Sequence, residues 1–225
     1  MTSLDGGPLA GVVFDKDGTL LDFHLTWDMA MGSTLSRLAP SAAVLEGAAR
    51  AIGYDLARQR VEPSSQLIAE SNATIMALLE PWLDTSTFQR VLDEEGAGRA
   101  RPAAAADALL DMLGAASVVL GLVTNDSEDV ARRQLADLGW ESRFSAVVGY
   151  DSGYGEKPDP GPVQAALVAM GVPGAAAAMV GDSHHDLVAA RGAGVTAVYV
   201  GRCRDLAARA DLSAADLAEL AAVWT

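Results

Sequence analysis

Two carboxylates, Asp15 and Asp17, stand two residues apart directly after the apolar residues 12–14 and before a Gly-Thr pair. A short apolar run predicts a buried strand, and ligands of open parallel sheets bind at the carboxyl ends of such strands. An Asp at that place can attack a phosphoryl group as a nucleophile, and a second Asp can donate and accept the proton. Taken alone, the segment could also be a polar turn.

A second apolar run, residues 118–123, ends in Thr124 and Asn125. A helix is expected directly afterwards, and the amino termini of helices attract phosphate. The hydroxyl of Thr124 and the adjacent backbone amides are therefore candidate phosphate ligands. The alternative is that Asn125 or Ser127 only caps the helix.

Lys157 precedes Pro158, and it is one of only two lysines in the chain, with Lys16. Lysines before helices are usually solvated charges. A compact ammonium differs, however, from the guanidinium that supplies almost every other cation here. Lys157 is therefore a candidate for neutralising a bound phosphate.

A third apolar run, residues 176–180, leads to Asp182 at the end of a strand, with Asp186 four residues later on the same face of the next helical turn. His184 and His185 also suggest zinc, together with Asp186. Adjacent histidines on one helix point in different directions and share an ion poorly, so zinc is not favoured.

These residues need a parallel α/β sheet to bring them together. Strands are predicted at residues 11–15, 118–123, 146–149, 176–180 and 196–200, with helices between them. Residues 127–138, 161–170 and 103–113 have helical patterns, and glycines end the first two. The predicted fold is therefore α/β, with a Rossmann-like parallel sheet.

Residues from about 23 to 99 differ, because their apolar positions follow helical spacing and no convincing strand is visible. We expect a core domain of residues 1–22 and 100–225 with an inserted α-helical cap domain of residues 23–99. His24, just inside this insertion, could reach substrate or lie at a hinge.

The four signals, in this order, resemble motifs I to IV of the haloacid dehalogenase-like phosphohydrolases, closest to the phosphoglycolate phosphatase-like branch. The resemblance covers residues 11–22 and about 103–202. It implies an aspartyl-phosphate on Asp15, general acid and base catalysis by Asp17, and phosphate binding by Thr124, Asn125 and Lys157. Lys16 is unusual, because the family usually has an apolar residue there, and its side chain should point away from the nucleophile.

The resemblance also implies a Mg²⁺ ion. Asp15, the backbone carbonyl of Asp17, and Asp182 would be its ligands, while Asp186 would orient them from behind. The implied function is a Mg²⁺-dependent phosphatase that hydrolyses a small phosphomonoester resembling phosphoglycolate. A phosphoglucomutase-like phosphotransferase has the same motifs and stays open.

Other classes fit less well. A phosphorylatable signalling domain combines Asp, Thr and Lys similarly, but it has about half this length and no insertion. Dehalogenases need neither a second acid nor a metal, and phosphonatases use a cap lysine that residues 23–99 lack. A catalytically idle relative would be expected to have lost a motif residue.

The composition bears on the binding partners and the cellular location of the protein. The net charge of −14 argues against binding nucleic acid, and the longest apolar run, residues 113–123, is too short to span a bilayer. The chain has one cysteine, Cys203, and no signal peptide is apparent, so we expect a cytoplasmic enzyme. The oligomeric state is not predicted.

Overall fold

The computed structural model describes residues 8–62, 64–70, 72–96 and 98–224. The chain folds into two compact units, Met1–Asp22 with Pro102–Thr225, and Phe23–Arg101. Within the described residues, no helix combines the length and apolar character needed to cross a membrane.

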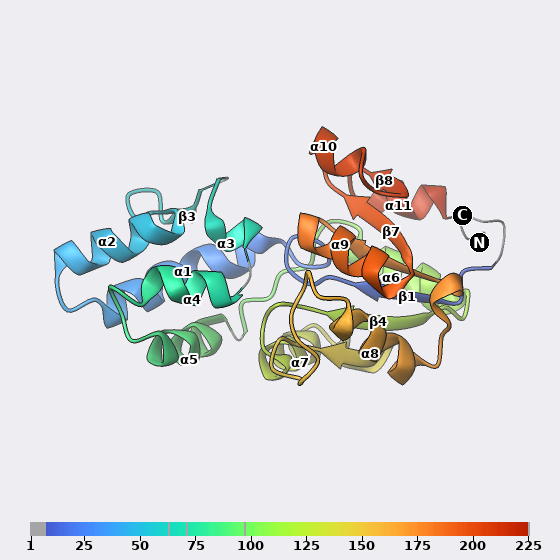
Figure 1. The fold of residues 1–225 in the computed structure, drawn as a ribbon, viewed down its shortest axis with the longest axis horizontal. Helices are drawn as coiled ribbons and strands as arrows, with labels where there is room; N and C mark the ends of the chain where they lie inside the picture. Colours follow the sequence, from blue (N-terminus) through green and yellow to red (C-terminus); the bar gives the residue numbers. More distant parts are fainter. Residues whose placement is uncertain (1–7, 63, 71, 97, 225) are drawn as a thin grey trace. The chain divides into compact units, whose positions relative to one another are not determined.

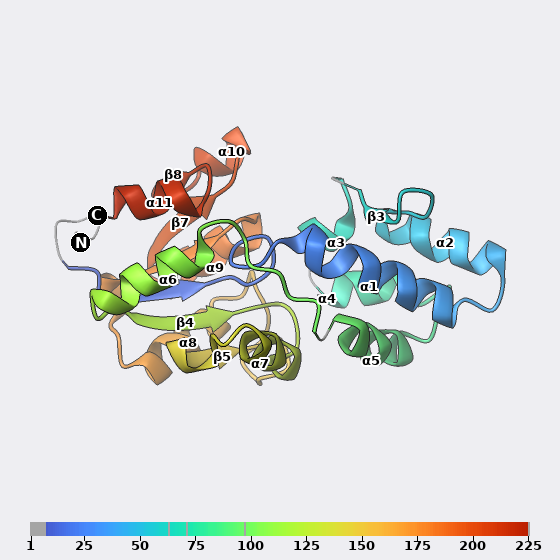
Figure 2. The same cartoon turned by 180° about the vertical axis from the view of Figure 1, so that it is seen from behind.

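The first unit is built on a six-stranded sheet in which every neighbouring pair of strands is parallel (Figures 1 and 2). The strand order is β5-β4-β1-β6-β7-β8, so β1 is central, with β4 on one side and β6 on the other. The predicted α/β fold with a Rossmann-like sheet is confirmed. The strands are β1 (Gly11–Phe14), β4 (Val119–Val123), β5 (Phe144–Val148), β6 (Ala177–Gly181), β7 (Thr196–Val200) and β8 (Leu212–Ala214).

Helices cover both faces of this sheet. The helices α8 and α9 pack on each other and on the face seen in Figure 1, whereas α6 and α11 pack together on the face seen in Figure 2. The helical elements of this unit are α6 (Ala106–Ala115), α7 (Glu128–Asp137), η1 (Glu141–Arg143), α8 (Gly161–Met170), η2 (Gly174–Ala176), α9 (His184–Ala193), α10 (Arg204–Ala207) and α11 (Leu217–Val223).

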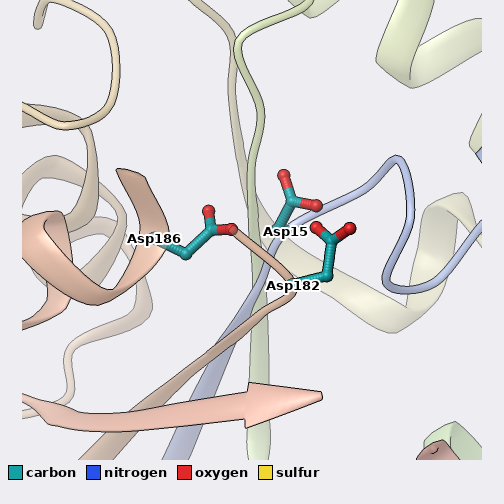
Figure 3. A group of neighbouring side chains, drawn as sticks. All are labelled: Asp15, Asp182 and Asp186. Carbon is teal, nitrogen blue, oxygen red and sulfur yellow. The ribbon is translucent and has the colours of Figure 1, made fainter. Parts of the chain in front are cut away.

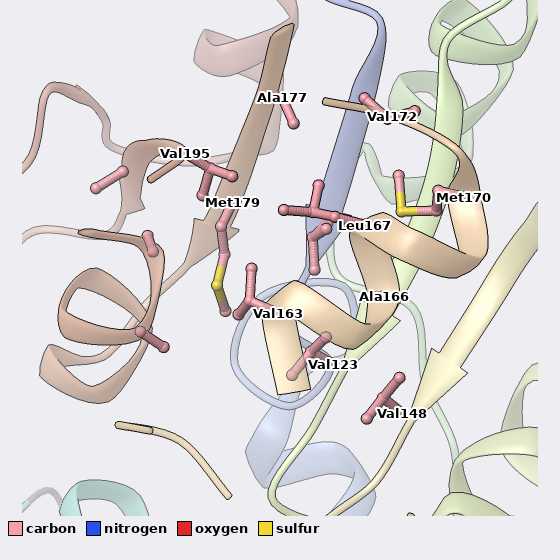
Figure 4. Close-up of a cluster of buried hydrophobic side chains, with 14 of the residues drawn as sticks. Val123, Val148, Val163, Ala166, Leu167, Met170, Val172, Ala177, Met179 and Val195 are labelled. Carbon is pink, nitrogen blue, oxygen red and sulfur yellow. The ribbon is translucent and has the colours of Figure 1, made fainter. Parts of the chain in front are cut away.

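One buried face of the sheet is filled by aliphatic side chains from α8. Val163, Leu167 and Met170 extend from this helix toward Val123 and Met179 of the sheet (Figure 4). Strands buried on both faces consist of continuous apolar residues, which is why β1, β4 and β6 were recognisable in the sequence. This packing fixes the strand ends that hold the polar residues described below.

The second unit is mainly helical. Its helices are α1 (Phe23–Leu38), α2 (Ala42–Ile52), α3 (Gln66–Ala69), α4 (Asn72–Leu79) and α5 (Thr85–Gly96). The expectation that this segment contains no strand was wrong, because β2 (Tyr54–Asp55) and β3 (Arg60–Val61) form an antiparallel pair.

This small hairpin is anchored on α1 through Asp28. The Tyr54 hydroxyl donates to the backbone carbonyl of Asp28 at 2.9 Å, and the Val61 backbone N–H donates to its carboxylate at 2.9 Å. His24 also lies 3.1 Å from the Asp28 carboxylate. Strands of two residues are too short to show alternation in a sequence, and the hairpin depends on these tertiary contacts instead.

Candidate active site

Three adjacent strands deliver polar residues to one edge of the sheet. Phe14, the last residue of β1, is in register with Leu122 of β4 and Val180 of β6. The next residue, Asp15, donates its backbone N–H to the Val180 carbonyl at 2.8 Å, which continues the ladder into the site. The carboxyl ends of β1, β4 and β6 therefore form the site, as expected for a parallel sheet.

Asp15, Asp182 and Asp186 gather at this edge (Figure 3). One oxygen of each carboxylate lies within 4.8 Å of the others. Asp15 follows β1, Asp182 follows β6, and Asp186 lies in the first turn of α9. Carboxylate oxygens are the preferred ligands of hard divalent cations, so this cluster is compatible with Mg²⁺. Neither His184 nor His185 belongs to this group of three aspartates.

Lys157 neutralises part of this negative charge. Its buried ammonium donates to the carboxylates of Asp15 and Asp186, the latter at 2.7 Å. Burial lowers the pKa of Lys157, but Asp15 and Asp186 outweigh that effect and raise it, so the side chain stays protonated. Lys157 therefore supplies a permanent positive charge beside Asp15.

One ammonium does not balance three carboxylates. Burial raises the pKa of Asp15 to about 7, with Asp186 and Asp17 acting in the same direction and Lys157 opposing them. Burial, Asp15 and Asp186 also raise the pKa of Asp182 well above its ordinary value. A further cation at this cluster would relieve both effects, which is an electrostatic reason to expect a metal ion there.

The Asp186 side chain is held in place by the start of α9. Ser183 is the N-cap of α9, and its backbone N–H and hydroxyl donate to Oδ2 of Asp186 at 3.0 and 2.6 Å. Oδ1 of Asp186 accepts from Lys157. Both oxygens therefore already have protein donors, a geometry that suits orienting neighbouring groups more than binding a metal directly.

Asp182 lies against the loop that follows Asp15. Gly18 has a φ of 89°, and a Cβ at this position would lie 2.2 Å from Oδ2 of Asp182. The hydroxyl of Thr19 is 3.5 Å from Oδ1 of the same carboxylate. Glycine at position 18 therefore leaves room for the Asp182 carboxylate, which a Cβ would displace.

Thr124 and Asn125, the two residues after β4, make different contacts. Thr124 is buried, and its Oγ1 accepts a hydrogen bond from the Asp126 backbone N–H at 3.1 Å. The Asn125 side chain instead pairs with the backbone of Lys157, donating to its carbonyl and accepting from its N–H, both at 2.8 Å. The Asn125 amide therefore anchors the Lys157 loop, a contact that the sequence did not suggest.

Asp17 and Lys16 form a separate contact beside the acid cluster. Lys16 Nζ lies 2.5 Å from Oδ2 of Asp17, whose side chain keeps 18% of its surface exposed. Lys16 itself is fully buried. The site thus separates a buried nucleophile candidate, Asp15, from a partly accessible carboxylate that can exchange protons.

Known proteins resemble this chain over most of its length. The model of the haloacid dehalogenase-like hydrolase family matches residues 12–200, which include every strand-end residue described above. The chain belongs to this family. Curated relatives include phosphoglycolate phosphatases from Xylella fastidiosa, 34% identical with 82% of this chain and 76% of that protein covered, and from Rhodospirillum rubrum, 35% identical with 84% and 78% covered.

The expectation of a phosphatase-type hydrolase in the phosphoglycolate phosphatase-like branch of the family is confirmed. The fold itself also occurs in solved members. The structure of CbbY from Rhodobacter sphaeroides in complex with phosphate has a TM-score of 0.68 and 20% identity, with 94% of this chain and 96% of that chain covered. At that identity the likeness supports the fold alone.

Proposed function

We propose that this haloacid dehalogenase-like hydrolase is a Mg²⁺-dependent phosphatase that cleaves a small phosphomonoester through an aspartyl-phosphate on Asp15. The observation that carries the proposal is the group of Asp15, Lys157 and Asp182, of which Asp15 and Lys157 are buried, assembled from the ends of β1 and β6 and the loop before α8. A buried carboxylate beside a permanent cation can act as a nucleophile while the cation binds the attacked phosphate.

In the first step, a carboxylate oxygen of Asp15 attacks phosphorus, and the bond from phosphorus to the leaving oxygen breaks. Asp17, protonated at this stage, gives its proton to that oxygen, so an alcohol leaves. Lys157 and the hydroxyl of Thr124 stabilise the charge on the non-bridging oxygens of phosphate. Asn125 contributes by holding the Lys157 loop in place.

In the second step, the Asp17 carboxylate takes a proton from water as that water attacks phosphorus. The bond from phosphorus to Asp15 breaks, inorganic phosphate leaves, and Asp15 is again a carboxylate. Asp17 regains the proton that it lost, so acid and base use the same group. Its partial exposure suits this exchange.

Asp15, the backbone carbonyl of Asp17, and Asp182 would hold Mg²⁺, with Asp186 orienting them. A bound Mg²⁺ supplies positive charge for the phosphoryl oxygens and for the crowded carboxylates. Its affinity depends on those carboxylates being deprotonated.

The substrate is proposed to be a small phosphorylated acid such as phosphoglycolate, because curated relatives at 34% and 35% identity are phosphoglycolate phosphatases. Phe23–Arg101, inserted after the segment with Asp15 and Asp17, is proposed to be the cap domain that selects it. The test is hydrolysis of phosphoglycolate and of an aryl phosphate with Mg²⁺ and in excess chelator. Undiminished turnover in chelator would contradict the metal assignment.

Mg²⁺ binding is expected to strengthen as the pH rises toward and past about 7, because burial raises the pKa of Asp15 to that value. Below it Mg²⁺ must displace a proton, which weakens binding by up to about tenfold per pH unit for one proton. In the metal-free protein, folding stability changes with pH in the opposite direction. The raised folded pKa means that the contribution of Asp15 to stability is present below 3.8 and lost as the pH rises through 7.

Thermal unfolding with and without Mg²⁺, at pH 5.5 and pH 8 and constant ionic strength, measures both effects. The increase in Tm caused by Mg²⁺ should be larger at pH 8, where the metal-free protein is weaker. An equal increase at both pH values would show that Asp15 does not exchange a proton for the metal.

Gly18→Ala is expected to weaken Mg²⁺ binding by about 10-fold to 100-fold, because the new methyl group displaces the Asp182 carboxylate. Gly153→Ala is the matched control. Gly153 has the same φ of 89°, but a Cβ there would meet nothing within 4 Å. Both variants carry a backbone strain of about 1–2 kcal/mol, so a defect shared by both in Mg²⁺ titration would mean that strain alone matters.

A further inference from the structure

Lys16 lies between Asp15 and Asp17, and its whole side chain is buried. Its ammonium lies 2.5 Å from Oδ2 of Asp17 and 3.2 Å from Oδ2 of Asp126, and it donates to Oε1 of Gln134 at 2.5 Å. All four residues belong to the sheet-containing unit. The resemblance to the family predicts an apolar residue here, whereas this chain has a buried lysine.

The network joins three separate elements of the site. Asp17 follows β1, Asp126 lies in the loop after β4 that carries Thr124, and Gln134 is a buried residue of α7. Lys16 therefore links the loop of the proposed acid and base to the loop of the proposed phosphate ligand. Fixing side chains that must meet a reacting group within a fraction of an ångström is a recurrent requirement of catalytic sites.

Burying a lysine ammonium costs free energy unless the charge is paired. The Lys16 ammonium is paired with the carboxylates of Asp17 and Asp126 and with the amide oxygen of Gln134, all within 3.2 Å. A methionine of similar length would fill the space without that cost. Of the two carboxylates that the charge contacts, only Asp17 is a residue of the proposed mechanism.

We propose that Lys16 is a positioning residue, whose buried ammonium holds the Asp17 carboxylate where it can protonate the leaving group and later activate water. The inference rests on the proposed phosphatase function. The ammonium restrains Oδ2, while the carboxylate keeps 18% exposure and so stays accessible to the reaction.

The proposal distinguishes the steps that need Asp17 from the step that does not. Forming the phosphoenzyme from an aryl phosphate with a good leaving group requires no proton donor. Forming it from an alkyl phosphate requires the acid, and its hydrolysis requires the base. Loss of Lys16 should therefore slow the last two steps and spare the first.

The test is rapid-quench measurement of phosphoenzyme formation and breakdown for the wild type and Lys16→Met, with p-nitrophenyl phosphate and phosphoglycolate. In Lys16→Met, formation from phosphoglycolate and phosphoenzyme breakdown should each slow by about 10²-fold or more, within the usual contribution of acid and base catalysis. Formation from p-nitrophenyl phosphate should be nearly unchanged.

Asp126→Asn is the matched control, because it removes the other carboxylate from Lys16 and leaves the contact with Asp17. It should leave all three rates close to wild type. Lys16→Met strands the Asp126 carboxylate, which can impair folding. The double variant Lys16→Met/Asp126→Asn removes this problem and should retain the selective pattern of Lys16→Met.

The outcomes separate the two proposals. A wild type that forms no phosphoenzyme from either substrate overturns the proposed function and this inference with it. An active wild type, with Lys16→Met and the double variant slowed equally in all three steps, shows that Lys16 only supports the fold. An equally selective loss in Asp126→Asn would assign the positioning role to the network as a whole and not to the contact with Asp17.

Discussion

Asp15→Asn is expected to lower kcat by at least about 10⁴-fold, since removal of a nucleophile is among the largest single effects in enzymes. An amide cannot form the acyl phosphate. The substitution also removes the negative charge that Lys157 contacts and that Mg²⁺ would bind. Steady-state turnover and radiolabelled phosphoenzyme, trapped by acid quench, should disappear together.

Asp22→Asn is the matched control for this variant, because it makes the same chemical change in the same segment at a residue that is not a member of the three-aspartate cluster. It should keep both turnover and phosphoenzyme. Persistence of labelled protein in Asp15→Asn would place the phosphoryl group on a different residue.

Asp17→Asn is expected to lower turnover by about 10²-fold to 10⁴-fold while allowing phosphoenzyme to accumulate. With an aryl phosphate, the nucleophile on Asp15 still works and the leaving group needs no proton. Hydrolysis of the intermediate lacks its base, so labelled protein should persist for longer than in wild type. Rapid-quench time courses with p-nitrophenyl phosphate measure both phases.

The amount of phosphoenzyme in Asp15→Asn, compared with that in Asp17→Asn, tests the division of roles between the two aspartates. Phosphoenzyme absent from Asp15→Asn and abundant in Asp17→Asn supports the division of roles. Equal loss of phosphoenzyme in both variants would mean that Asp17 is needed for the first step even without proton transfer, and the roles would have to be reassigned.

The sheet and its strand-end acids were predictable because buried parallel strands are continuous apolar runs. The runs before Asp15 and Thr124 are followed at once by the polar residue, and the run before Asp182 is followed by Gly181 and then by the acid. In a parallel sheet these ends meet at one edge, so the local sequence was enough to predict that the three residues lie close together. The final strand, β8, was missed because it has only three residues and lies between short helices.

Contacts between distant segments could not be predicted in the same way. The Asn125 side chain has many possible partners, and only the fold brings the Lys157 backbone to it. Lys16 stands between Asp15 and Asp17 in the sequence, and its partners Asp126 and Gln134 lie more than 100 residues away. Such pairings depend on strand order and helix placement, which a single sequence does not record.

The most direct test of the central claim is chemical identification of the phosphorylated residue. Wild-type enzyme and Asp17→Asn would be mixed with an aryl phosphate and Mg²⁺, quenched, and treated with borohydride, which reduces an aspartyl-phosphate to homoserine. Peptide mass spectrometry should then find homoserine at position 15 in both proteins, in greater yield in Asp17→Asn. Active enzyme with unmodified Asp15, or with the modification at another residue, would contradict the account.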